Sequence, residues 1–143
     1  MLRVAIWQMR SGGTMARCRE SVLQGIARAA GQGAHVVSFP ENSLALGCDD
    51  ARPVRLPELE WVAEAARQHA IDVCLGVIEQ QEEQKKAFNS LVWWSSDGQR
   101  TVYRKRHLFD HAPSNLKESA NVEAGADLVT VTCRGIKCGL AIW

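Results

Sequence analysis

The chain of 143 residues is long enough for one domain with a hydrophobic core and too short for two. Its 17 basic and 16 acidic side chains leave a net charge of +1, which gives no electrostatic reason to expect a nucleic acid or an acidic membrane surface as partner. No stretch has the apolar length that a bilayer requires, and we expect no targeting segment. The five cysteines are scattered without a Cys-x-x-Cys pair, so a reduced, cytoplasmic setting is predicted.

The first third of the chain has the pattern of a strand, a helix and a second strand. Residues 2–9 are almost continuously apolar, which favours an inner strand covered on both faces. Thr14 can cap a helix whose apolar residues recur at three- and four-residue steps, with Gly31 and Gly33 ending it. Residues 35–39 then form a second strand. This order implies a right-handed parallel crossover.

Glu41 comes directly after the second strand, because Pro40 stops that strand by removing a backbone donor. The position is the carboxyl end of a parallel strand, where open α/β sheets bind their ligands. Two roles are therefore open for Glu41. It is either a functional carboxylate or a turn residue before Asn42 and Ser43.

A second crossover helix and a third strand follow an irregular loop at residues 42–56. Pro57 is placed to open the helix, and small apolar residues recur along one of its faces. Residues 71–78 form the third strand. The polar run at residues 79–86 is interpreted as an exposed connection without chemistry.

A β-hairpin is indicated by an Asp-Gly pair between two β-rich runs, residues 87–94 and 99–104. Lys105 therefore ends a hairpin strand. Trp93 and Trp94 cannot face the same side of one strand, and we expect one in the core and one at an edge or interface.

Lys105 carries a compact ammonium that can hold a developing oxyanion if neighbouring carboxylates keep it charged. The alternatives are a strand end with solvated basic residues and a nucleic-acid-binding patch, which the small net charge disfavours. His107 and His111 are four residues apart, but Pro113 and the lack of apolar periodicity argue against a helix. No metal site is expected there.

The last part of the chain is predicted to be a loop followed by two strands. Residues 111–127 form the loop, which contains Glu118, and residues 128–133 and 136–143 form strands around a tight turn. The sequence stops inside the second of these strands. Four cysteines are interpreted as small core residues, namely Cys18, Cys74, Cys133 and Cys138.

Taken together, Glu41 after Phe-Pro, Lys105 after Tyr-Arg, and Glu118 ahead of an Ala-Gly pair form an ordered set. With the final run at residues 135–142, this set resembles the carbon–nitrogen hydrolases of the nitrilase superfamily, and the similarity extends from the first strand to Trp143. The resemblance implies an α/β fold that is half of an α-β-β-α sandwich, with a mixed sheet and two crossover helices on one face.

The same resemblance implies hydrolysis of nonpeptide carbon–nitrogen bonds in amides, carbamoyl compounds or nitriles through a Glu-Lys-Cys triad, without a metal or an organic cofactor. Glu41 would be the general base and Lys105 would stabilise the oxyanion. Glu118 matches the glutamate that orients the lysine and the substrate. Two carboxylates around one ammonium would help to keep it protonated.

The chain departs from the family pattern at the nucleophile. In the family a cysteine follows the strand that matches residues 139–142, whereas Trp143 stands there in this chain. Its indole has no ionisable nucleophile and cannot form a thioester. Cys138 lies five residues earlier and points to the opposite face, and Cys133 is on the other side of the turn, so neither replaces it. The chain alone is expected to be inactive.

Family domains are longer, and residues 1–143 are expected to be a single truncated domain, the N-terminal half. Unpaired strand edges predict association with a second copy or with a complementary fragment. A small amide or nitrile is the expected ligand, with neither nucleic acid nor membrane as partner. The alternatives are a non-catalytic binding or assembly module and a truncated gene product.

Overall fold

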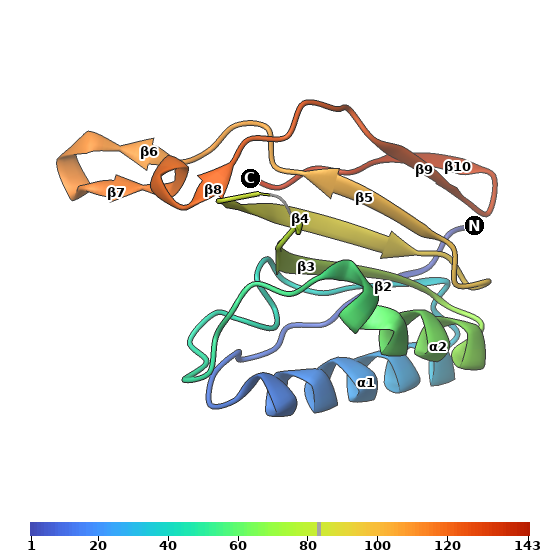
Figure 1. Ribbon diagram of the computed structural model, residues 1–143. Coiled ribbons are helices and arrows are strands. Elements are labelled where there is room, and N and C mark those ends of the chain that lie inside the picture. Colours follow the sequence, from blue (N-terminus) through green and yellow to red (C-terminus); the bar gives the residue numbers. More distant parts are fainter. Residues whose placement is uncertain (83) are drawn as a thin grey trace.

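The computed structural model describes residues 1–82 and 84–143 and shows an α/β fold in layers. A mixed sheet lies between two helices on one side and a β-hairpin on the other (Figure 1). In chain order the elements are β1 (Val4–Ile6), α1 (Met15–Gly31), β2 (Val36–Ser38), α2 (Glu60–His69), β3 (Asp72–Glu79), β4 (Ala87–Trp94), β5 (Arg100–Arg104), β6 (Asp110–His111), β7 (Leu116–Lys117), β8 (Val122–Glu123), β9 (Thr130–Cys133) and β10 (Ile136–Gly139).

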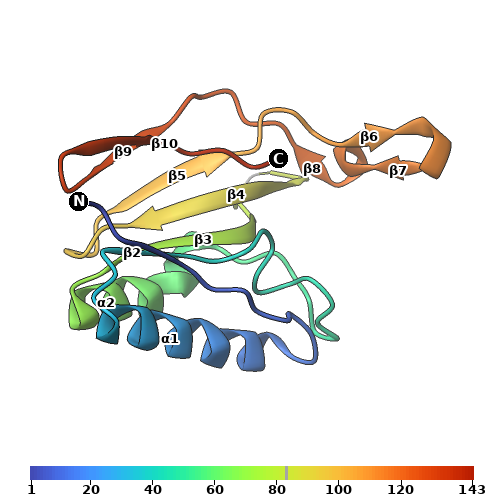
Figure 2. The same ribbon diagram turned by 180° about the vertical axis from the view of Figure 1, so that it is seen from behind.

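The main sheet has the strand order β1-β2-β3-β4-β5, and the short β8 pairs with β4. Strands β1, β2 and β3 are parallel, whereas β4 is antiparallel to both β3 and β5. Helix α1 connects β1 to β2, α2 precedes β3, and both helices cover the same face, as the view from behind also shows (Figure 2). The predicted α/β fold with a mixed sheet and two crossover helices on one face is confirmed.

Helix α1 begins where the capping signal predicts, whereas α2 begins later than predicted. Thr14 Oγ1 accepts a hydrogen bond from the Arg17 N–H at 3.3 Å, and α1 begins directly after it. After the helix, Gly33 takes the left-handed φ of +73° that lets the chain turn back. Pro57, however, lies in a 3-10 turn, Leu56–Leu59, so α2 begins at Glu60 rather than at the proline.

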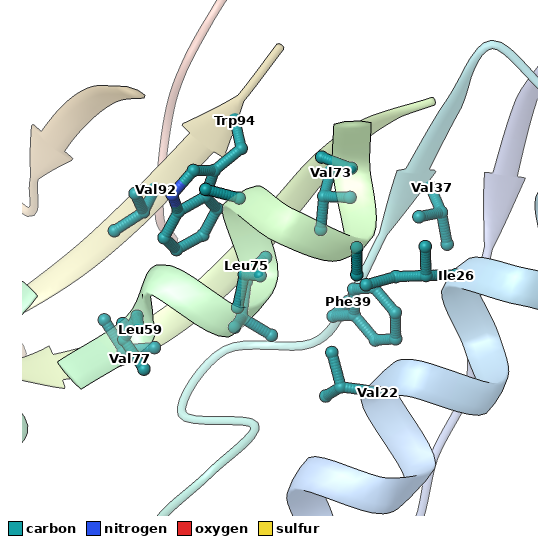
Figure 3. Packing of buried hydrophobic residues seen from close by; sticks show 14 of the residues in the cluster. Val22, Ile26, Val37, Phe39, Leu59, Val73, Leu75, Val77, Val92 and Trp94 are labelled. Carbon is teal, nitrogen blue, oxygen red and sulfur yellow. The ribbon is translucent and has the colours of Figure 1, made fainter. Parts of the chain in front are cut away.

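The larger hydrophobic core lies between the helices and the sheet (Figure 3). Apolar residues of α1, of α2 and the turn before it, and of strands β2, β3 and β4 pack together there. Burial of one such aliphatic side chain contributes about 2 kcal/mol. The labelled members are Val22, Ile26, Val37, Phe39, Leu59, Val73, Leu75, Val77, Val92 and Trp94. This core anchors the strands whose ends carry the polar residues described below.

A second, smaller core covers the opposite face of the sheet beneath the β9–β10 hairpin. It contains Trp93, Tyr103, Cys133 and Leu140. Trp93 is 7% exposed and Trp94 is 1% exposed, so the expectation that one of them lies at an edge was wrong. The two indoles point to opposite faces, and both faces are covered.

The first strand differs from its prediction. It comprises only Val4–Ile6 and pairs in the described residues with β2 alone, so it is an edge strand and not an inner one. Val4 is 48% exposed and Ile6 is 76% exposed. A continuous apolar run can mark either position, because the pattern does not say which strands lie beside it.

The C-terminal third contains more short pairings than the sequence indicates. The expected loop at residues 111–127 includes a small arm of β6 and β7 that projects from one end of the sheet (Figure 1). The last strand ends at Gly139 instead of running to residue 143, and Cys138 is partly exposed rather than a core residue. Cys18, Cys74 and Cys133 are buried as expected.

None of the helices within residues 1–82 and 84–143 is both long enough and apolar enough to cross a membrane.

Candidate active site

Lys105, at the end of β5, lies between the two carboxylates that the sequence singles out. Its Nζ is 3.7 Å from Glu41 Oε1 and 3.1 Å from Glu118 Oε2. Glu41 follows the end of β2, and Glu118 opens a 3-10 turn after β7. Lys105 is only 4% exposed. Burying an unpaired ammonium costs free energy, and the two neighbouring carboxylates offset that cost. Three segments that are distant in sequence thus meet around one cation.

Asn89 is a member of this cluster that the sequence reasoning missed. It is 1% exposed in β4, and its Nδ2 donates to Glu41 Oε1 at 2.5 Å and to Glu118 Oε1 at 3.1 Å. Its backbone oxygen also accepts the Lys105 N–H at 2.8 Å. The alternation of side chains along the hairpin strands could have indicated Asn89. Ser90 pairs with Arg104, so the adjacent residues Asn89 and Lys105 lie together on the opposite face of the sheet.

The backbone at Lys105 is held on two sides. Its N–H donates to Asn89, and its carbonyl oxygen accepts the Gly125 N–H at 2.8 Å. A Cβ at Gly125 would collide with the backbone of Arg104, so a glycine is required for this close approach. The Ala-Gly pair noted in the sequence therefore helps to place the lysine.

Burial and hydrogen bonding act in opposite directions on Glu118. Desolvation alone would raise its pKa, but the Phe109 N–H, the Asn89 amide and the Lys105 ammonium together hold the pKa below its usual value. The bond from the Phe109 N–H is 2.7 Å long. Glu118 is therefore a carboxylate at neutral pH and supplies a fixed negative charge beside Lys105.

A cavity of about 920 Å³ opens beside the lysine. Its polar lining is Glu41, Lys105, His107, Lys117 and Glu118, and Trp143 lines the same cavity together with apolar residues. Those are Leu108, Phe109, Leu116 and Ile142. All four residues proposed from the sequence thus border one space. An apolar cavity with a few converging polar groups is the usual form of a small-molecule site.

The backbone of Glu41 rests on Gly76 of β3. A Cβ at Gly76 would lie 2.7 Å from the Pro40 oxygen and 2.8 Å from the Glu41 Cα, both backbone atoms that cannot easily give way. Gly76→Ala is therefore expected to lower the free energy of unfolding by about 2 kcal/mol and to displace Glu41. Urea denaturation measures the first effect. Gly139→Ala is the matched control in a strand, because its added Cβ would meet nothing within 4 Å. Equal stability of the two variants would contradict this prediction.

On the opposite face of the same hairpin, Glu79 forms a buried ion pair with the residue before Lys105. Arg104 Nε and Nη2 lie 2.8 Å and 2.6 Å from the two carboxylate oxygens, and Ser90 Oγ donates to Glu79 at 2.7 Å. Glu79 is 2% exposed, so the prediction that residues 79–86 form an exposed connection was wrong at its first residue. Residue 83 of that run lies outside the described residues.

Within the part of the chain that the structure describes, no group of three or more His, Cys, Asp or Glu side chains is arranged to hold a metal ion. Of the two lysines that line the cavity, Lys105 is the buried one. Its ammonium group can donate hydrogen bonds to a carbonyl oxygen or to the oxyanion that forms from it.

Solved structures share this fold. The amidase NitN from Nesterenkonia sp. AN1 is 17% identical with a TM-score of 0.79, over 99% of this chain and 56% of that chain. XC1258 from Xanthomonas campestris, a CN-hydrolase superfamily protein with an arsenic adduct in its active site, is 24% identical with a TM-score of 0.81, over 96% of this chain and 51% of that chain. A carbon–nitrogen hydrolase from Helicobacter pylori G27 is 18% identical with a TM-score of 0.80, over 98% of this chain and 50% of that chain.

The chain therefore spans about half the length of these three proteins. At such identities the likeness establishes the fold. Comparison with curated proteins finds no match. A sequence model of one family, described as carbon-nitrogen hydrolase, matches residues 3–143. Because that match covers almost every residue, this chain belongs to the carbon–nitrogen hydrolase family, in the nitrilase superfamily.

Proposed function

We propose that this chain carries the amide-binding part of a carbon–nitrogen hydrolase site and does not turn over substrate by itself. The observation that supports the proposal most directly is the buried Lys105 ammonium between the carboxylates of Glu41 and Glu118 at the wall of an apolar cavity. In this role Lys105 donates to the carbonyl oxygen of a small nonpeptide amide or nitrile-derived group. A related amidase from Nesterenkonia sp. AN1 has been solved with butyramide, which supports this substrate class.

The other residues have complementary roles in the proposal. Glu41 occupies the position of the general base, and Glu118 orients the lysine and the ligand. Asn89 donates to both carboxylates and so holds their spacing around the ammonium. Trp143 occupies the nucleophile position. An indole cannot attack a carbonyl, so the tetrahedral intermediate and the thioester would not form.

The test is a titration of the chain with butyramide by calorimetry, together with an assay for released ammonia. We expect saturable binding without ammonia, because the carbonyl-binding group is present and the nucleophile is absent. Lys105→Met should weaken binding about 10- to 100-fold, the value of one charged hydrogen bond. Circular dichroism verifies that the variant is folded.

Lys117→Met is the matched control, because Lys117 lines the same cavity but is exposed on β7. It should bind butyramide as the unmodified chain does. Two results would contradict the proposal. One is binding that survives Lys105→Met, and the other is ammonia release by the pure chain that Glu41→Gln abolishes.

We also propose that residues 1–143 correspond to the N-terminal half of the family's domain and associate with a second copy or with a complementary fragment. Coverage of about half of the solved relatives supports the first part. The exposed apolar side chains of edge strand β1, Val4 and Ile6, support the second. A monodisperse monomer in light scattering at high concentration would contradict self-association.

A reducing, cytoplasmic location belongs to the same proposal. It is supported by the five cysteines, all of which are free thiols. Fractionation of cells that express the chain would test it.

A further inference from the structure

Two of the free cysteines lie against each other beside the loop that leads away from Glu41. Cys18 Sγ, on α1, is 3.3 Å from Cys48 Sγ, at the end of that loop. Cys18 is 2% exposed, whereas Cys48 is partly exposed. A disulfide bond is about 2.05 Å long, so the two sulfur atoms need to approach by only roughly 1 Å.

The backbone segments that carry the two cysteines are already hydrogen-bonded to each other. The Asp49 N–H donates to the Gly13 oxygen at 2.7 Å, and the Met15 N–H donates to Asp50 Oδ1 at 2.7 Å. Gly13 and Cys48 also form an isolated parallel bridge. Because these contacts fix the loop end on the start of α1, joining the sulfur atoms requires side-chain rotation and not a rearrangement of the fold.

We infer that Cys18 and Cys48 form an oxidative modification site, at which hydrogen peroxide joins the two thiols in an intramolecular disulfide. The partly exposed Cys48 sulfur attacks a peroxide oxygen and becomes a sulfenic acid, and the displaced hydroxide leaves as water with the thiol proton. The Cys18 sulfur then attacks the sulfenic sulfur. The S–S bond forms, and the hydroxyl leaves as a second water with the Cys18 proton. Two thiols thereby lose two electrons and one peroxide becomes two waters.

The disulfide would restrict the motion of the loop between Asn42 and Cys48, because it attaches the end of this loop to α1. The other end of this loop is already held, because the Ser43 N–H donates to the Gly76 oxygen at 3.0 Å. With both ends fixed, the segment that follows Glu41 has less freedom to move. In a reducing compartment this restriction is reversible, as disulfides there are transient.

Burial and the neighbouring Cys18 thiol raise the pKa of Cys48 to about 11, so the reactive thiolate is scarce at neutral pH. The rate of disulfide formation should therefore rise about tenfold per pH unit between about pH 7 and pH 9.

The test treats the full chain with hydrogen peroxide at about pH 9, alkylates the remaining thiols and maps the peptides by mass spectrometry without reduction. We expect a peptide that links Cys18 to Cys48, lost on adding dithiothreitol, and a rise in Tm of about 8 °C. Cys48→Ser should lose both effects, whereas Cys138→Ser should keep them. Absence of the linked peptide, over-oxidation of Cys48 alone, or equal linkage to other cysteines would overturn the inference.

Hydrogen–deuterium exchange tests the restriction of the loop itself. In the oxidised chain, the amides of Ala45, Leu46 and Cys48, which hydrogen-bond within the loop, should exchange more slowly than in the reduced chain. Amides of the exposed β6–β7 arm provide the internal reference. A linked peptide without slower exchange in the loop would show that the bond does not brace it.

Discussion

Replacing Glu79 by alanine is expected to lower the free energy of unfolding by about 3 kcal/mol. Glu79 is 2% exposed and accepts two bonds from Arg104 and one from Ser90. Alanine leaves the guanidinium without its carboxylate and the hydroxyl without an acceptor. The side chain of Arg104 is 30% exposed and can recover some hydration, which keeps the cost below that of a wholly buried charge. Urea denaturation measures the difference.

The same pair gives a pH dependence with a defined sign. Burial alone would raise the pKa of Glu79, but the hydrogen bonds from Arg104 and Ser90 outweigh it and hold the pKa below its ordinary value of 4.5. A carboxyl whose pKa is lower in the folded state stabilises the fold above its ordinary pKa and loses this contribution as the pH falls further. The loss of unfolding free energy caused by Glu79→Ala should therefore become smaller below about pH 4.5.

Glu82→Ala is the matched control for this prediction. Glu82 forms an ion pair with Arg55 at 3.4 Å, but its side chain is 82% exposed. Exposed pairs of this kind contribute about 0.5 kcal/mol or less. If Glu79→Ala costs no more than Glu82→Ala, the buried pair does not hold the end of β5, and the placement of Lys105 must depend on other contacts.

Local signals in the sequence were sufficient for the two helices, for the hairpin and for two of the cluster residues. Thr14 marks the start of α1 because its hydroxyl satisfies a free backbone donor. Glu41 and Lys105 follow strands, and the carboxyl ends of strands in such sheets converge where ligands bind. Glu118 was identified only through the family resemblance, because nothing in the loop around it indicates its position.

The remaining features depend on contacts that no local pattern encodes. Glu79 opens a run of polar residues and looks solvated, yet β4 and β5 bury it by supplying Ser90 and Arg104. Trp93 is buried because the distant β9–β10 hairpin covers its face. Asn89 sits within a β-rich run, where one polar residue usually indicates an exposed position, and only the hairpin register places it beside Lys105. Long-range pairing therefore determines these three environments.

Trp143→Cys is expected to convert position 143 from unreactive to reactive toward acrylamide. In a solved variant of the Nesterenkonia sp. AN1 amidase that carries a Glu-to-Gln replacement, acrylamide has added to the active-site cysteine. In this chain, a thiol at position 143 would line the cavity that Glu41 and Lys105 also line. A carboxylate base and an ammonium in one cavity favour formation of the thiolate. We expect alkylation at this position at least about tenfold faster than at a thiol without these neighbours.

Ile142→Cys is the matched comparison, because Ile142 lines the same cavity and precedes position 143. Peptide mapping by mass spectrometry measures both rates and separates them from the five native cysteines. Adding Glu41→Gln to Trp143→Cys should slow the reaction, since the amide cannot take the thiol proton. It should not abolish the reaction, because the active-site cysteine of a Glu-to-Gln variant of the Nesterenkonia sp. AN1 amidase still reacted with acrylamide. Equal rates in the two single variants would show that position 143 is not the nucleophile position. The proposed lack of turnover would then require a cause other than the indole.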